Sequence, residues 1–258
     1  MLGTIQKANN VLSLFTESKS EWGVTEIALL LSEPKSTVHE LLSSLAQLGW
    51  LSRTEKGRYR LGMAVFRYSQ TALRVFPYKD ESHHALQELA DRFGDMAQMG
   101  ILVNNELLYA DAAHGPNRAG LPITSIGAYF PAHAFAMGKV LLAHAPWEQV
   151  QAHFEKKGLT SFTQNTIVKL DQLKAELEQI RQQGYAISQS EFMREWSAVA
   201  APILGRDGIV VAAISASVTV QRYPMQSNEL IAAVITSANT LSKTFGYKPQ
   251  AAVVLPNP

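Results

Sequence analysis

The sequence predicts an α+β protein in two parts that differ in their pattern of secondary structure. In residues 1–62, three segments with apolar residues at helical spacing precede two short β-rich runs, the order of a winged helix-turn-helix. From residue 78 to 247, strands and helices follow one another in an order that favours an antiparallel sheet. A helical pattern over 63–77 links the two domains, and 248–258 is read as a tail.

Composition limits the classes of protein that the chain can belong to. No apolar run approaches the ~20 residues that cross a bilayer, and the first ten residues lack the pattern of a secretion signal, so we expect a cytoplasmic protein without a membrane partner. The absence of cysteine excludes disulfides, thiol nucleophiles and thiolate metal sites. A net charge of +1 gives no global attraction to polyanions, so any nucleic-acid surface must be local.

The clearest segment is 34–50, PKSTVHELLSSLAQLGW, which predicts a helix that ends at Gly49. Pro34 suits the start of a helix, and the hydroxyls of Ser36 and Thr37 lie where they could satisfy free amides of the first turn. One face of this helix is apolar and is expected to pack: Val38, Leu41, Leu42, Leu45 and Leu48. The opposite face is polar and is free to read a partner: Ser36, His39, Glu40, Ser43 and Gln47.

Two further helices and a hairpin complete the predicted module. Apolar spacing favours a first helix over 5–15 and a second, short one that begins at Val24 or Thr25 and stops before Pro34. Residues 50–53 and 58–61 indicate two strands around a turn at 55–57. Periodicity alone fits equally well a three-helix module that touches no DNA.

Positive charge is concentrated in the predicted hairpin. Residues 1–64 carry seven cations against six carboxylates, so the module is barely basic as a whole. Four of the seven cations lie in the hairpin, where a wing could contact the phosphate backbone: Arg53, Lys56, Arg58 and Arg60. A solvated basic turn is the alternative.

Residues 27–62, IALLLSEPKSTVHELLSSLAQLGWLSRTEKGRYRLG, resemble the DNA-binding half of IclR-type transcriptional regulators. The family pattern runs roughly "IA…GLPKSTVHRLL..L...G....…YRLG". The resemblance implies double-stranded operator DNA as a partner, with phosphate or base contacts from Lys35, Ser36 and Thr37. The sequence departs from the pattern at Ser32, Glu33 and Glu40, where the family usually has glycine, leucine and arginine. Acidic charge at two of these positions leaves open a sensor that no longer recognises DNA tightly.

The rest of the chain predicts the linking helix and a second domain. Helical patterns cover 63–76, 81–93, 134–145, 147–156, 170–183 and 228–245. β-rich runs cover 96–103, 107–113, 185–190, 198–204 and 210–218, and the first two flank the polar turn 104–106. The linking helix could couple the domains, pair two subunits or act as a spacer.

This second part also resembles the IclR family. Residues 126–127, 131–134 and 137–143 match a pattern like "G..LPLHATAAGKALLA", and 164–167, 173–186, 199–203 and 212–217 continue the match. The resemblance implies a GAF-like effector-binding domain, assembly as a homodimer or homotetramer, no cofactor, and control of transcription, typically of a catabolic operon, by a small molecule.

The resemblance also implies where the effector would bind. The expected pocket lies between 129–139 and the strands near 188, 198 and 215–217, with this lining: Phe130, Ala136, Met137, Ser188, Glu191, Ala198, Ser215 and Ser217. Apolar walls with a few hydroxyls suit a small ring, and amides at a helix start near Ala134 could hold a carboxylate without a buried cation. We therefore expect the effector to be a small organic acid, preferably an aromatic one, and not a sugar phosphate. The alternative is that these residues simply fill a core.

An enzyme is not expected. His133, Lys139 and Glu191 are possible acid–base groups, and His83-His84 with His114 or His133 possible metal ligands, but no spacing supports either set. The sequence has no G-x-S-x-G elbow, P-loop, H-E-x-x-H or dinucleotide fingerprint. Adjacent histidines point to different helix faces, and His133 near a helix start is expected to be structural. We predict neither a catalytic nor a metal site.

Overall fold

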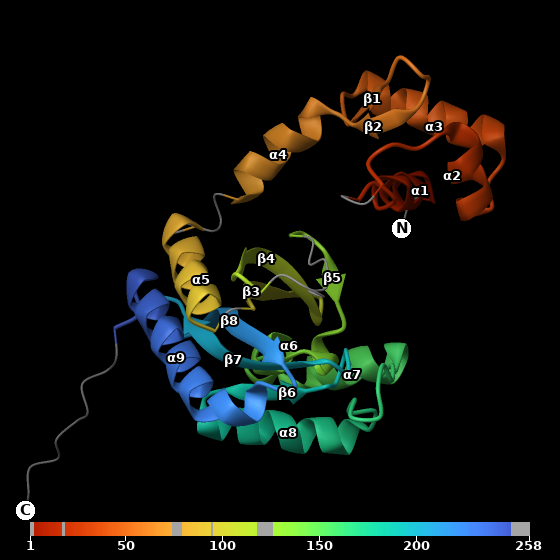
Figure 1. The fold of residues 1–258 in the computed structure, drawn as a ribbon. Helices are drawn as coiled ribbons and strands as arrows, with labels where there is room; N and C mark the ends of the chain where they lie inside the picture. The colour runs from red at the N-terminus through yellow and green to blue at the C-terminus, as the bar shows by residue number, and fades with distance from the viewer. Residues whose placement is uncertain (1–2, 17–18, 74–78, 94, 118–125, 249–258) are drawn as a thin grey trace, which may run out of the picture. The chain divides into compact units, whose positions relative to one another are not determined.

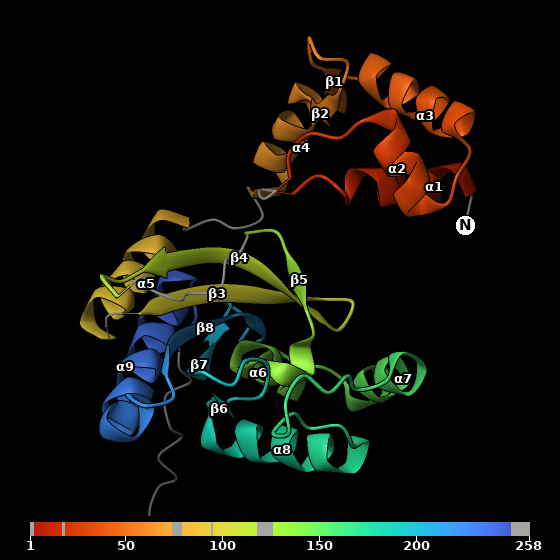
Figure 2. The same ribbon diagram turned by 45° about the vertical axis from the view of Figure 1, so that its right-hand side comes forward.

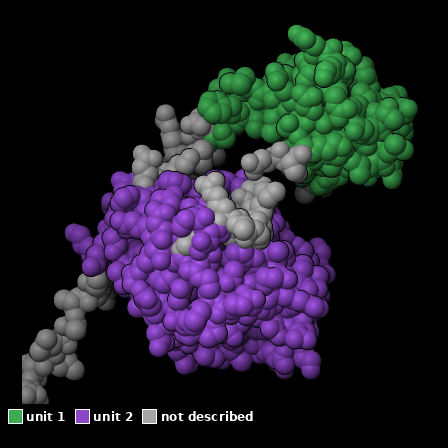
Figure 3. Space-filling view, in the orientation of Figure 1, with its two compact units in different colours: residues 1–77 green, residues 78–258 purple. Residues whose placement is uncertain are grey.

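The computed structural model describes residues 3–16, 19–73, 79–93, 95–117 and 126–248. The chain divides into two compact units, Met1–Pro77 and Tyr78–Pro258 (Figure 3). Among the described residues, the first unit has one hydrophobic core and the second unit has two. The predicted tail lies outside the described residues apart from Lys248.

The first unit is a winged helix-turn-helix. Helices α1 (Gly3–Leu12), α2 (Val24–Leu31) and α3 (Lys35–Gln47) precede strands β1 (Leu51–Arg53) and β2 (Tyr59–Leu61), which pair antiparallel (Figure 1). Helix α4 (Met63–Leu73) follows, and the predicted end of this linking helix, 74–76, lies outside the described residues. The core gathers one face of α1, α2 and α3 with the hairpin: Val11, Ile27, Leu42, Leu45, Leu51 and Tyr59.

Four details of the first unit differ from the sequence prediction. Leu48 is 65% exposed, because α3 ends at Gln47 and the chain turns before Leu48 can reach the core. Ile5 is likewise exposed, and α1 ends at Leu12 although Phe15 is still buried. Neither Ser36 nor Thr37 caps α3, whose N-cap is Pro34.

Positive φ angles occur at three turns of the described part of this unit, and Gly57, with φ +73°, occupies the turn of the hairpin. Gly49 has φ +73°, as expected for the residue that ends α3. Ser32 ends α2 with φ +54°, a left-handed conformation that disfavours residues with a Cβ atom. The position where the family pattern has glycine therefore demands a glycine-type backbone, and this chain holds a serine there.

The second unit is built on one antiparallel sheet of six strands in the order β5-β4-β3-β8-β7-β6. The strands are β3 (Met96–Val103), β4 (Glu106–His114), β5 (Tyr129–Phe130), β6 (Ala186–Gln189), β7 (Trp196–Leu204) and β8 (Val210–Thr219). The turn between β3 and β4 is tight, because Asn104 and Asn105 both take positive φ. The α+β fold with an antiparallel sheet is confirmed.

Helices cover both faces of the sheet. Helices α5 (Lys79–Phe93) and α9 (Tyr223–Thr244) pack on one face, and α6 (Ala136–Ala143), with α7 (Trp147–Lys157) and α8 (Leu170–Gln183), on the other (Figures 1 and 2). Side chains alternate between these two cores along each strand, so that Ala97 and Met99 face α5 and α9 while Met96 and Gln98 face α6.

The prediction differs most from the structure at two helices of the second unit. The helix expected over 134–145 is broken: a 3₁₀ turn η1 (Ala132–Ala134) is followed by extended Phe135, and α6 begins at Ala136. The break folds η1 back onto α6, where a Cβ atom on Gly138 would lie 2.1 Å from the Ala132 carbonyl oxygen. The last helix begins at Tyr223 and not near 228, with Pro224 in its first turn.

Candidate DNA-binding surface and effector cavity

The polar face of α3 is available to a partner. Lys35, Ser36, His39 and Glu40 are exposed, and Thr37 and Ser43 are half-buried beside them. The first backbone hydrogen bond of α3 runs from the Val38 amide to the Pro34 carbonyl at 3.0 Å. The three amides before Val38 therefore lie at a helix start, which favours an anion such as a phosphate.

Glu33 does not present a free negative charge beside this helix. Its carboxylate forms an ion pair with the Lys7 ammonium at 2.8 Å, which joins α1 to the turn between α2 and α3. Of the two acidic departures from the family pattern, only Glu40 is exposed on the polar face.

The four wing cations fall into two groups. Arg53, Lys56 and Arg60 are exposed, and the Arg60 Nε donates to the Ser52 hydroxyl at 3.2 Å. Arg58 is half-buried, and its guanidinium reaches the Glu26 carboxylate at 2.7 Å and the Glu21 carbonyl at 3.0 Å. Arg58 thus fastens the wing to the start of α2.

Glu26 is the centre of that attachment. Its carboxylate accepts a hydrogen bond from the Gly23 amide at 2.7 Å. This bond, with Lys19 and Arg58 nearby, lowers the pKa of Glu26, so the side chain stays ionised for its arginine partner.

A cavity of about 80 Å³ lies between the sheet and the η1–α6 segment of the second unit. Seven of the eight residues expected to bind the effector line it: Phe130, Ala136, Met137, Ser188, Ala198, Ser215 and Ser217. The structure thus brings together residues from four separate stretches of the sequence, as the expected pocket requires.

Other lining residues were not among those expected. They are Met96, Gln98, Tyr109, Ala134, Phe135, Phe192, Met193, Trp196 and Ser197. The pairing of β3 with β8 places Met96 opposite Ser217 and Gln98 opposite Ser215. Residues paired across two strands share a face of the sheet, so this register identifies Met96 and Gln98 as lining residues. The sequence alone does not establish which strands pair.

Aromatic rings form one side of the cavity. The ring centroids of Tyr109 and Phe130 are 4.4 Å apart, those of Phe130 and Phe135 5.3 Å, and those of Phe135 and Phe192 4.5 Å. A wall of this kind suits a flat apolar ligand, which can pack against ring faces and edges.

The polar groups of the cavity are few and uncharged. Gln98 is 2% exposed, and its amide oxygen lies 3.5 Å from the hydroxyls of both Ser215 and Ser217. Its amide nitrogen donates to the Met96 sulfur, a weak acceptor, at 3.4 Å, and Gln98 also forms a hydrogen bond with the Tyr109 phenol. The contacts of Gln98 with Ser215, Ser217 and Met96 are long or weak, so they can give way to a hydrogen bond with a ligand.

Burial raises the pKa of Tyr109, although a hydrogen bond with Gln98 opposes this. The phenol thus stays protonated at neutral pH and can donate to a ligand. None of the described lining residues carries a formal charge.

The start of α6 opens onto the same cavity. The first hydrogen bond of α6 runs from the Lys139 amide to the Phe135 carbonyl at 2.9 Å, so the amides of Ala136, Met137 and Gly138 have no partner within the helix. The helix start that could hold a carboxylate is therefore at Ala136, two residues after the predicted Ala134.

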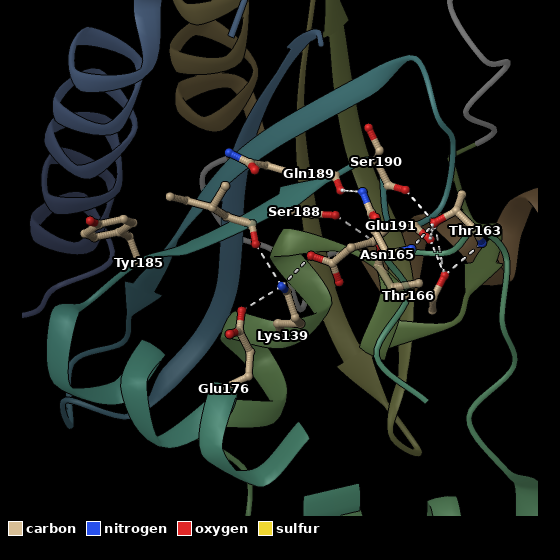
Figure 4. Close-up of polar contacts among 12 residues, drawn as sticks. Lys139, Thr163, Asn165, Thr166, Glu176, Tyr185, Ser188, Gln189, Ser190 and Glu191 are labelled. Atoms are coloured by element: carbon tan, nitrogen blue, oxygen red, sulfur yellow. Dashed lines mark hydrogen bonds and ion pairs between the residues drawn. The ribbon is translucent and has the colours of Figure 1, made fainter. Parts of the chain in front are cut away.

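Glu191, the eighth expected residue, does not line the cavity. Its carboxylate is buried and lies 2.7 Å from the Lys139 ammonium (Figure 4). Burial raises the pKa of Glu191, and Lys139 opposes this by stabilising the ionised form. Two of the three possible acid–base groups are thus partners of each other, and neither lines the cavity.

The histidines have structural contacts. His133 is buried, with Nε2 3.0 Å from the Thr160 carbonyl oxygen, and burial lowers its pKa, which favours the neutral ring that donates to this carbonyl. His83 contacts the Asp111 carboxylate at 3.1 Å. Across the part of the chain that the structure describes, no group of three or more histidine and acidic side chains could hold a metal ion, and no helix is long and apolar enough to span a membrane.

The exposed polar face of α3 and the basic wing in one unit, with an uncharged cavity in the other, are the features expected of a DNA-binding regulator that responds to a small molecule. The family model "IclR helix-turn-helix domain" matches residues 4–55, and "Bacterial transcriptional regulator IclR C-terminal" matches 70–243. The chain belongs to the IclR family of transcriptional regulators. This family is not one of enzymes, which confirms that expectation.

Individual relatives agree with this assignment over nearly the whole chain. The HTH-type transcriptional regulator XynR of Escherichia coli is 32% identical over 223 residues, which cover 86% of this chain and 88% of that protein. The crystal structure of Thermotoga maritima IclR matches with a TM-score of 0.73 at 26% identity, covering 96% of this chain and all of that one. An IclR homolog from Microbacterium hydrocarbonoxydans, complexed with 4-hydroxybenzoate, matches with a TM-score of 0.81 at 22% identity over 94% of this chain and 99% of that one.

Proposed function

We propose that this regulator takes a small aromatic acid as its effector and, through it, controls a catabolic operon from the cytoplasm. The observation that carries the proposal is the uncharged cavity, which combines aromatic walls with the start of α6. Affinity for such a ligand comes from apolar burial, and orientation comes from a few polar groups.

The carboxylate of the ligand would lie at the start of α6. Amides without helical partners and the positive end of the helix dipole stabilise an anion there without a buried cation. Ser188 is close to this end, since its hydroxyl lies 3.4 Å from the Ala134 carbonyl oxygen.

The ring would occupy the space beside Phe130, Phe135 and Phe192. Gln98, Ser215 and Ser217 lie on the sheet that forms the floor, where they can bond a polar substituent such as a hydroxyl. The structural relative that holds 4-hydroxybenzoate has the same fold.

A sugar phosphate is disfavoured by the same cavity. A dianionic phosphate would lose its hydration, and the described lining offers no lysine, arginine or protonated histidine to replace it. The choice between a monoanionic acid and a phosphate therefore tests the proposal.

A thermal-shift panel of aromatic acids, aliphatic acids and phosphorylated sugars provides that test. A ligand at ~100 times its dissociation constant adds roughly 2.7 kcal/mol of stability, enough to move the melting temperature by several degrees. We expect aromatic acids to give the largest shift. A shift with a phosphorylated sugar alone would refute the proposal.

On DNA, we propose that the protein acts as a homodimer or homotetramer. One reading helix covers few base pairs, and two-fold paired modules about one helical turn apart are the usual solution. Sedimentation of the free protein and of its DNA complex tests this. A monomer that binds a single duplex site tightly would contradict it.

The alternative function is a small-molecule sensor that no longer recognises DNA tightly. The argument for it rests on Glu40 alone, because Glu33 is paired with Lys7. A carboxylate on the reading face can accept a bond from cytosine N4 and select a base pair, but it repels phosphate. Glu40→Arg should raise general DNA affinity and change the preferred site in a selection from random duplexes. If neither changes, Glu40 has no role in reading.

A further inference from the structure

The loop between β6 and β7, residues 190–195, forms part of the cavity wall. It begins with Ser190 in a left-handed conformation, φ +57°, and then carries Phe192 and Met193 into the lining. The ring of Phe192 packs against Phe135 at 4.5 Å and Phe162 at 4.8 Å between centroids. The position of this loop therefore sets the shape of the cavity.

A buried lysine, Lys139, binds the loop through the side chain of Glu191. The Lys139 ammonium, on α6, is 1% exposed and lies 2.7 Å from the Glu191 carboxylate, 2.8 Å from the Glu176 carboxylate of α8 and 2.8 Å from the Ile187 carbonyl (Figure 4). Three N–H donors thus meet three oxygen acceptors from three different elements. An ammonium so placed is fully hydrogen-bonded without water.

The segment 163–166 holds the backbone of the same loop. The Thr163 hydroxyl lies 2.6 Å from the Ser190 carbonyl oxygen, and the Thr166 hydroxyl 2.6 Å from that of Glu191 (Figure 4). The Asn165 side-chain Nδ2 donates to the Gln189 carbonyl at 3.1 Å. Glu191 is therefore held at both its main chain and its side chain.

The charges in this cluster do not balance. Two carboxylates face one ammonium, and the second oxygen of Glu191, Oε2, is buried without a hydrogen-bond partner. A buried polar atom without a partner destabilises the fold, so a simple packing role could be filled more stably by an apolar side chain. The geometric effect of the pair is to join the loop to α6.

We propose that Glu191 is a positioning residue: its pairing with Lys139 holds the β6–β7 loop against α6, so that Phe192 and Met193 close the cavity around the effector. This inference rests on the proposed function of the cavity. Glu191 itself touches no ligand, and it acts only through the placement of the two residues that follow it.

The matched pair Glu191→Gln and Glu176→Gln tests the proposal. Each variant removes one carboxylate from Lys139 at nearly constant volume, but only Glu191 belongs to the loop. Without ligand, amide hydrogen exchange in peptides that cover 189–196 should be at least tenfold faster in Glu191→Gln. Glu176→Gln should exchange in this loop like the wild type.

Affinity for 4-hydroxybenzoate and benzoate, measured by thermal shift, is the second readout. We expect the dissociation constant to rise at least tenfold in Glu191→Gln and less than threefold in Glu176→Gln. Equal effects of the two variants on both readouts would overturn the positioning role. Loss of either carboxylate beside Lys139 would then be enough to explain the effects. If neither acid binds the wild type, the proposed function fails, and the exchange comparison alone decides the role of Glu191.

A second variant covers the case in which Glu191→Gln does not fold. Thr166→Val keeps the shape of the side chain and removes the hydroxyl that bonds the Glu191 carbonyl. It should also speed exchange in 189–196 and weaken acid binding. Unchanged exchange in Thr166→Val would contradict the attachment of the loop.

Discussion

The two domains use positive charge in opposite ways. In the first, Arg53, Lys56 and Arg60 stand exposed on the wing. In the second, Lys139 is buried with three oxygen partners, and the nearby cavity has no charged residue among its described lining. The cations of the wing are exposed to a partner, whereas Lys139 is buried and stabilises its own domain.

The difference follows from what each partner requires. DNA is a polyanion, so exposed cations attract it by releasing its counterions, and the attraction weakens with salt. A small ligand must lose its water to enter a cavity, so selection depends on shape and on a few hydrogen bonds. Charge in the second domain therefore acts on the scaffold of the cavity and not on its ligand.

The largest expected effect comes from removing the buried lysine. Lys139→Met leaves Glu176 and Glu191 without their cation, and breaking a buried pair in this way costs about 3–5 kcal/mol. The matched surface variant is Lys157→Met, whose partner is Glu106 and whose loss should cost about 0–1 kcal/mol. Urea denaturation measures both, and similar losses would show that Lys139 has no special structural role.

The next effect concerns the ligand. Ala198→Leu adds three carbon atoms to a lining position of a cavity of about 80 Å³. Affinity for an aromatic acid should fall about 100-fold or more, equivalent to about 2.7 kcal/mol by calorimetry. DNA affinity of the ligand-free protein should be unchanged. Full acid affinity in this variant would place the ligand elsewhere.

A smaller effect separates the two kinds of wing arginine. Arg60→Ala should reduce the slope of log affinity against log salt by about 0.9, the value for one phosphate contact. Arg58→Ala should leave this slope nearly unchanged. It should lower the free energy of unfolding by about 1 kcal/mol, because the contact between Arg58 and Glu26 is lost. The reverse pattern would show that Arg58 leaves Glu26 to contact DNA.

The smallest effect is at the turn between α2 and α3. Ser32 has a left-handed conformation, so Ser32→Gly should relieve backbone strain and stabilise the protein by about 0.5–1 kcal/mol. Thermal denaturation measures the gain. A loss of stability would mean that the serine side chain makes a contact worth more than the strain.

The sequence predicted the elements well where local patterns dominate. The apolar face of α3 is confirmed at Val38, Leu42 and Leu45, which are buried. The prediction that Leu48 packs in the core was wrong, because the helix ends before this residue. The exact end of the helix depends on the turn into β1. The break at Phe135 was missed because the surrounding residues are good helix formers, and only close packing of Gly138 on Ala132 reveals the fold of that segment.

For the cavity, the sequence was least informative about partners that are distant along the chain. Gln98 belongs to the site because β3 pairs with β8, 117 residues away at Ser215. Glu191 was expected to face the ligand, but Lys139, 52 residues earlier, holds it. Such contacts depend on strand order and helix packing, which no local pattern encodes.

The account requires that occupancy of the cavity alters DNA binding. The direct measurement is the affinity for the best duplex from a random selection, with and without the acid that gives the largest thermal shift, in the wild type and in Ala198→Leu. We expect the acid to change the wild-type dissociation constant at least about fivefold, within the usual range of allosteric coupling, and to leave the variant unaffected. An equal response in both proteins, or a wild type that binds the acid without any change in DNA affinity, would contradict the account.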